Sequence, residues 1–136
     1  MAKNKLIAWL FGVVIVIAAA LAVSAIRSRG ERKRQALYQS ILRQYSTTLR
    51  PGAQRGEVEA VLASQGREFQ QTCCLLKDNK NAPEDIVKIG SEQPSYCKDM
   101  YLVFEFESPP GPTVRETNAS DRLLRVALVP WLGGCR

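Results

Sequence analysis

The most reactive side chains of this 136-residue chain are four cysteines: Cys73, Cys74, Cys97 and Cys135. An even number of cysteines in a small domain without histidine is typical of proteins that form disulfides. Neighbouring side chains of a strand point to opposite faces, so we expect two longer bridges rather than a bond between neighbours. These would join Cys73 to Cys97 and Cys74 to Cys135, or the swapped partners. Each would stabilise the domain by roughly 2–4 kcal/mol.

The same thiols suggest two alternatives. A redox-active Cys73/Cys74 pair would make this a thiol redox protein or sensor, although the CxxC spacing that lowers a thiol pKa is missing. Zinc sites use cysteine and histidine in closely spaced pairs, and the chain has neither histidine nor CxxC. We therefore expect no metal site and no cofactor.

The sequence offers few candidate residues for acid–base catalysis. Glu105 and Glu107 lie two residues apart, and strand alternation predicts that both face solvent. A Ser-His-Asp triad is impossible because the chain has no histidine. The sequence thus predicts a non-enzymatic protein without catalytic residues.

The basic charge is confined to the N-terminal part of the chain. Residues 1–50 hold nine basic groups and one acidic group, a net charge of +8, whereas residues 51–136 hold 10 basic and 12 acidic groups, a net charge of −2. A slightly acidic domain lacks the positive surface that binds phosphate backbones. We therefore expect no nucleic-acid partner.

An apolar segment without charges, Leu6–Ile26, precedes the rest of the chain. Its length of 21 residues corresponds to on the order of 30 Å as a helix, enough to cross a membrane. A cleaved signal peptide is the alternative, but the apolar run is long for one and five basic residues would follow the cut. We expect an uncleaved anchor in residues 1–26, a basic juxtamembrane helix in 27–50 and a small domain in 51–136.

The orientation of this anchor is ambiguous. The basic residues that follow it favour a cytoplasmic domain that acts as a membrane-surface regulator on anionic lipid. The cysteines favour an exported domain, periplasmic or extracellular, which we prefer because long segments translocate largely regardless of flanking charge. The basic, lipid-facing flank consists of Arg27, Arg29, Arg32, Lys33 and Arg34.

The periodicity of the remaining chain predicts an α+β domain. Residues 31–49 carry apolar side chains at helical spacing, which either pack on the domain or support self-association. A second helix is expected from Arg55 to about Ser64, ending before Gly66. Strands are expected at 68–76, 100–107 and 121–129, with 85–89 as a strand or a helical turn. Two helices would pack on a three- to four-stranded antiparallel sheet after the transmembrane helix.

Residues 49–62, with the sequence LRPGAQRGEVEAVL, resemble the opening motif of the SmpA/BamE-type family of small bacterial envelope proteins. The resemblance implies helices followed by a small antiparallel sheet, and a non-enzymatic accessory role in outer-membrane β-barrel assembly. This chain departs from the family in lacking a lipobox cysteine and in carrying four cysteines.

Together these features predict a single-pass, membrane-anchored envelope protein whose domain has an interaction or structural role, for which the family resemblance suggests an assembly accessory. The expected partner is another protein, in addition to the membrane. Either the outer face of the sheet, around Tyr101 and Val103, or the C-terminal tail with Trp131 would form the contact surface.

Overall fold

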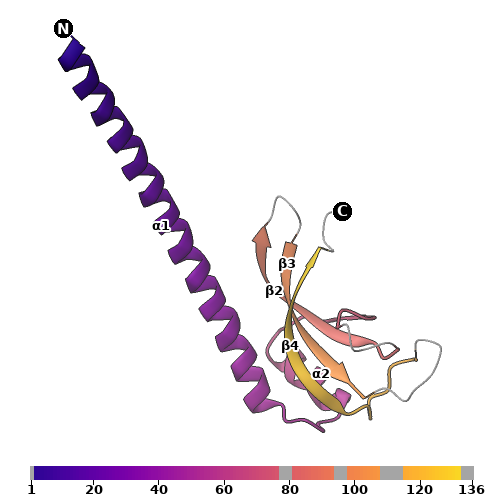
Figure 1. Cartoon of the computed structure of the whole chain (residues 1–136). Coiled ribbons are helices and arrows are strands. Elements are labelled where there is room, and N and C mark those ends of the chain that lie inside the picture. Colours follow the sequence, from indigo (N-terminus) through magenta and orange to yellow (C-terminus); the bar gives the residue numbers. More distant parts are fainter. Residues whose placement is uncertain (1, 77–80, 94–97, 108–114, 133–136) are drawn as a thin grey trace. The chain divides into compact units, whose positions relative to one another are not determined.

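The structure is a computed structural model, and it describes residues 2–76, 81–93, 98–107 and 115–132. Its elements are α1 (Ala2–Thr48), α2 (Arg55–Ser64), β1 (Gln70–Thr72), β2 (Glu84–Gln93), β3 (Lys98–Phe106) and β4 (Leu123–Leu132). The strands form one antiparallel sheet in the order β1-β2-β3-β4 (Figure 1). The predicted α+β class is therefore confirmed, with two helices and a four-stranded sheet.

Helix α1 contains the predicted apolar segment and the predicted juxtamembrane helix without a break. Among the described residues, one helix is long and apolar enough to cross a membrane, and its most apolar stretch has a mean hydropathy of 2.6 and no buried residues. By length and composition, this agrees with a single membrane pass. The basic residues Arg27, Arg29, Arg32, Lys33 and Arg34 all lie on α1 and are exposed.

The chain divides into two compact units, Met1–Leu37 and Tyr38–Arg136. The division falls within the predicted juxtamembrane segment 27–50. The second unit therefore contains the last turns of α1 together with α2 and the sheet, and it holds all of the buried core described below.

The apolar stripe at the end of α1 packs against the sheet within this second unit. Tyr45 and Leu49 are buried, and the Tyr45 ring meets the Phe104 ring edge-on with centroids 5.7 Å apart. This is the packing alternative predicted for residues 31–49. The buried core cluster consists of Tyr45, Leu49, Val58, Leu62, Val87, Leu102, Phe104, Phe106 and Leu123.

Helix α2 has the predicted bounds. It starts where the Gln54 N–H donates to the Glu57 carboxylate at 2.9 Å, which satisfies a helix-terminal N–H. It ends at Ser64, and Gly66 follows with a φ of +65°, a left-handed conformation that glycine adopts readily. The N–H of Arg67 then donates to the Leu62 carbonyl at 2.9 Å. Gly66 therefore turns the chain sharply out of the helix.

The sheet differs from the prediction mainly at its first strand. The predicted strand 68–76 is wrong in length, because β1 comprises only Gln70–Thr72 and pairs only with Glu84–Ile86 of β2. Residues 85–89 belong to a strand and not to a helical turn. Strand β4 extends three residues beyond the predicted end at Val129 and takes in Trp131.

The register assigns each side chain to one of two faces, because residues paired across antiparallel strands share a face. Val87 and Leu102 are paired and belong to the core beneath the helices. Ile86 is paired with Val103, so both lie on the opposite side of the sheet. We call this opposite side the far face.

Gly90 provides a test of the packing of α1 on the sheet. A Cβ atom at this position would overlap the hydroxyl oxygen of Tyr38 and lie 2.8 Å from its Cε1. Tyr38 is only 2% exposed, so its ring has little room to move aside. We expect Gly90→Ala to lower the free energy of unfolding by about 1–3 kcal/mol through overpacking.

The measurement is urea denaturation of the full-length protein in a nonionic detergent. Gly56→Ala is the matched control, because its Cβ would meet its nearest neighbours at 3.6 Å, an ordinary contact. Equal destabilisation by the two substitutions would contradict the close packing of Tyr38 against β2.

Candidate functional site

A buried arginine organises the polar interior of the domain. Arg55, the first residue of α2, is 1% exposed, and its Nη1 lies 2.6 Å from Asp85 Oδ1. Its Nη2 donates to the Pro83 carbonyl at 2.7 Å, and its Cζ lies 3.9 Å from the centre of the Phe106 ring. The guanidinium is thus held by an ion pair, a carbonyl and an aromatic face, as buried cations require.

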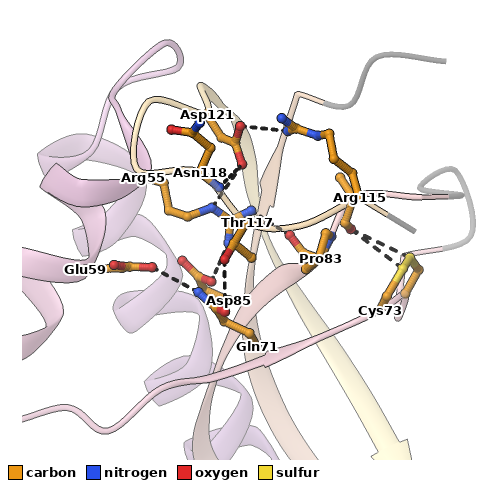
Figure 2. Close-up of polar contacts among 12 residues, drawn as sticks. Arg55, Glu59, Gln71, Cys73, Pro83, Asp85, Arg115, Thr117, Asn118 and Asp121 are labelled. Carbon is orange, nitrogen blue, oxygen red and sulfur yellow. Dashed lines mark hydrogen bonds and ion pairs between the residues drawn. A yellow bond between two sulfur atoms is a disulfide. The ribbon is translucent and has the colours of Figure 1, made fainter. Parts of the chain in front are cut away.

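Asp121 links this arginine to a second one. Its carboxylate lies 3.4 Å from Arg55 Nε and 2.7 Å from Arg115 Nη2. Its carbonyl accepts the Arg55 N–H at 2.8 Å, so backbone and side chain both hold the start of α2. We call Arg55, Asp85, Arg115 and Asp121 the Arg55 cluster (Figure 2).

Asp85 is the member of the cluster that can exchange a proton near neutral pH. Burial raises its pKa to about 7, since loss of hydration outweighs the attraction of Arg55. The negative charge of Glu59, a half-buried residue of α2, raises the pKa further. Asp85 therefore keeps its proton to much higher pH in the folded protein than in the unfolded chain.

The cysteine pair lies beside this cluster. The structure joins Cys73 to Cys74, so the expected bridges from these residues to Cys97 and Cys135 are wrong. The expectation assumed a strand, whereas β1 ends at Thr72 and strand alternation no longer separates the two side chains. Cys97 and Cys135 themselves lie outside the described residues.

Residues 81–83 lie opposite the cysteines, and each of their three carbonyl groups has a contact. The sulfur atoms of Cys73 and Cys74 lie 3.7 and 3.6 Å from the Ala82 carbonyl oxygen. The preceding carbonyl, of Asn81, accepts the Arg115 N–H at 2.8 Å, and the following one, of Pro83, accepts from Arg55. Figure 2 shows Cys73 near Pro83 and the Arg55 cluster.

Glu84 holds the residues that follow the cysteines. Its side chain is completely buried, and its carboxylate accepts the N–H groups of Leu75 at 2.7 Å and Leu76 at 3.2 Å. A carboxylate without water needs such donors. Glu84 therefore ties the chain beyond Cys74 to β2.

A groove lies along β2 beside the start of β1. It has a volume of ≈ 820 Å³, and we call it the edge groove. Its lining comes from the segment between α2 and β1, from β2 and from one residue of β3: Gly66, Arg67, Glu68, Phe69, Gln70, Ile86, Val87, Lys88 and Tyr101.

The three predicted contact residues differ in how far they are buried. Tyr101 and Trp131 are half-buried and pack edge-on, with ring centroids 5.6 Å apart. Val103 is completely buried, so its side chain forms no part of an exposed surface. The prediction that Glu105 faces solvent is wrong, because it is 7% exposed and pairs with Arg125 of β4 at 2.5 Å. Glu107 is exposed as predicted.

The Arg55 cluster is not predicted by the sequence pattern. Arg55 and Asp85 are 30 residues apart, and no periodicity or motif relates them. The one available signal was an arginine in the first turn of a helix, where the helix dipole disfavours a cation unless acidic groups lie near. Such groups can be found in the fold but not in the local sequence.

No match to this chain is found among protein-family models, curated proteins or solved structures.

Replacing the central arginine tests whether the cluster stabilises the fold. We expect Arg55→Met to lower the free energy of unfolding by about 3–5 kcal/mol, because it leaves buried carboxylates without their cation. Arg122→Met, at the exposed position next to Asp121, should change the free energy of unfolding by less than about 0.5 kcal/mol. The double variant Arg55→Met/Asp85→Asn should recover part of the loss. Urea denaturation of the full-length protein measures all three, and an Arg55→Met variant as stable as wild type would refute the role of the cluster.

The raised pKa of Asp85 predicts a pH dependence of stability. Between pH 4 and 7 the folded protein binds more protons at Asp85 than the unfolded chain, so this residue's contribution to stability falls as pH rises through that window. Asp85→Asn cannot ionise, so the stability of wild type relative to this variant should decline from pH 4 to pH 7 and then level off. Denaturation midpoints at several pH values measure the difference. A constant or rising difference would show that Asp85 is not protonated in this range. Asp99 does not interfere, because hydrogen bonds from Lys88 and Ser91 lower its pKa and place its effect below this window.

Proposed function

We propose that this protein is a non-enzymatic, single-pass membrane protein of a cell envelope, whose small domain binds an extended segment of a partner protein in the edge groove. The observation that carries this proposal is that the groove runs beside an unoccupied sheet edge. In the described part of the chain, β1 pairs only with Glu84–Ile86, and no strand lies beside Val87 and Lys88, the next residues of β2, which line the groove.

An unoccupied strand edge offers backbone N–H and C=O groups to another chain. An extended peptide satisfies such groups by adding a strand to the sheet, and pockets beside the edge then select its side chains. The edge groove supplies such a pocket, with Phe69 and Tyr101 as apolar contacts and Arg67, Glu68 and Lys88 as polar ones. This combination supports a polypeptide in preference to a small ligand.

The aromatic pair supports the same proposal. Tyr101 lines the groove and rests against Trp131, so the indole holds the phenol ring in place. Half-buried aromatic residues with a fixed orientation are common among residues that dominate binding energy. On its other side, Tyr101 is paired across the sheet with Lys88, whose ammonium is fixed by Asp99 at 2.7 Å.

The remaining parts of the proposal concern location. Helix α1 supports an anchor, and the Cys73–Cys74 pair supports an exported domain, because disulfides persist in oxidising compartments. The resemblance of residues 49–62 to the SmpA/BamE-type family supports an assembly accessory as the kind of partner-binding protein. The basic flank, Arg27 to Arg34, supports the alternative of a cytoplasm-facing regulator.

Photo-crosslinking in the native membrane tests the binding site. A photoreactive residue replacing Gln70, an exposed residue of the groove, should crosslink to a distinct protein, and the crosslinked peptide of that protein should be an extended segment. The same residue at Leu124, 45% exposed on β4 at the opposite sheet edge, is the control and should not capture that protein.

Two substitutions should then weaken the crosslink. Tyr101→Ala removes a groove contact, and Trp131→Ala removes its support, so each should cost about 1–2 kcal/mol of binding, or roughly 5- to 30-fold in affinity. Leu124→Ala is the matched control and should leave the yield unchanged. Unfolding midpoints must show that the variants are folded. Unchanged yields in both aromatic variants, or crosslinks to lipid or to a second copy alone, would contradict the proposal.

A further inference from the structure

The paired cysteines differ in accessibility. Cys73 is exposed and Cys74 is half-buried, although they are neighbours in the chain. A disulfide with one accessible sulfur can be attacked by a thiolate from solution, whereas a buried disulfide cannot. We propose that Cys73 and Cys74 form a thiol–disulfide exchange site that an external dithiol reduces by attack at Cys73.

The surroundings of the pair suit both of its oxidation states. Both sulfur atoms lie within 3.7 Å of the Ala82 carbonyl oxygen. After reduction, a thiol S–H at this position can donate a weak hydrogen bond to that oxygen. The same carbonyl therefore serves the disulfide as a contact and the dithiol as an acceptor, and reduction requires no unfolding.

The carbonyl group that both sulfur atoms contact is held in place by its neighbours. Ala82 is completely buried, and its neighbours Asn81 and Pro83 are held by Arg115 and Arg55. On the other side, Glu84 holds the N–H groups of Leu75 and Leu76. Thr72, before the cysteines, pairs with Glu84 of β2, and Leu75 and Leu76 follow them, so the chain is held on both sides and an opened pair remains close enough to reform.

The exchange proceeds in two balanced steps. A thiolate of the reductant attacks the sulfur of Cys73, a mixed disulfide forms, and Cys74 leaves as a thiolate that takes up a proton. The second thiol of the reductant then attacks its own sulfur in the mixed disulfide, and Cys73 leaves as the second thiol. In total, two electrons and two protons pass to the protein, its S–S bond breaks, and the reductant forms a disulfide.

This arrangement selects for a dithiol. A monothiol bound to Cys73 would be expelled by the adjacent Cys74, because that thiolate is part of the same chain and has a high effective concentration. A dithiol has its own intramolecular thiol and completes the second step. The class of reductant is therefore a dithiol, and a monothiol should be ineffective.

Mass spectrometry of the full-length protein from its native membrane tests the site. Trypsin separates the cysteines into the peptides 68–77, 89–98 and 126–136. After free thiols are alkylated without reduction, peptide 68–77 should be unmodified and lighter by two hydrogen atoms than its reduced form. Treatment of the folded protein with dithiothreitol should then allow this peptide to take up two alkyl groups, and an equal concentration of glutathione should not. Trp131 and Trp9 fluorescence monitors folding throughout.

Single variants test the point of attack. The remaining cysteine of Cys74→Ser, which is Cys73, should be alkylated several-fold faster in the folded protein than the Cys74 that remains in Cys73→Ser. Equal rates would overturn attack at Cys73. Peptide 68–77 crosslinked to 89–98 or 126–136, or alkylated only after unfolding, would overturn the exchange site. These outcomes are independent of partner binding in the edge groove.

Discussion

The domain is organised around a cation that has no access to water. Arg55 is 1% exposed, and an unpaired guanidinium at that depth would be strongly unfavourable. Its partners come from distant parts of the chain: Asp85 from β2, Pro83 from the segment before it, and Asp121 from the segment that leads into β4. All three must be in place before the charge can be buried. The start of α2 is therefore fixed relative to both halves of the sheet by one side chain.

The ion pair with Arg55 offsets only part of the free-energy cost of burying the Asp85 carboxylate. Asp85 loses more from dehydration than it gains from Arg55, so its pKa rises, whereas Asp121 is shared between Arg55 and Arg115. Protonation of Asp85 therefore removes one negative charge from beside Arg55. The carbonyls of residues 81–83 connect this interior to the cysteines at the surface, because consecutive peptide groups bind Arg115, the two sulfurs and Arg55. The polar interior and the exchange site consequently share one short segment.

Elements defined by local periodicity could be predicted from the sequence. Helix α2 was found with its bounds because Val58 and Leu62 repeat at helical spacing and Gly66 ends the pattern. Strand β3 was found because its apolar residues alternate. Features that depend on tertiary contacts could not be found in this way. Glu105 follows the polar side of that alternation but is buried by its pair with Arg125, and β1 stops before the cysteines although the sequence continues with strand-forming residues. For Glu105, the partner that buries it comes from another strand, which the local pattern does not show.

The edge groove follows from the same constraint that buries Arg55. Antiparallel pairing of Gln70 with Ile86 would bring Phe69 opposite Val87 if β1 continued towards its N-terminus. The chain cannot continue in that direction, because α2 ends at Ser64, Gly66 turns the backbone away, and the helix itself is tied at Arg55. Only three residues of β1 can then reach β2, and the next two residues of that edge, Val87 and Lys88, line a groove. The buried ion pairs thus hold open the sheet edge at which a partner segment is proposed to bind.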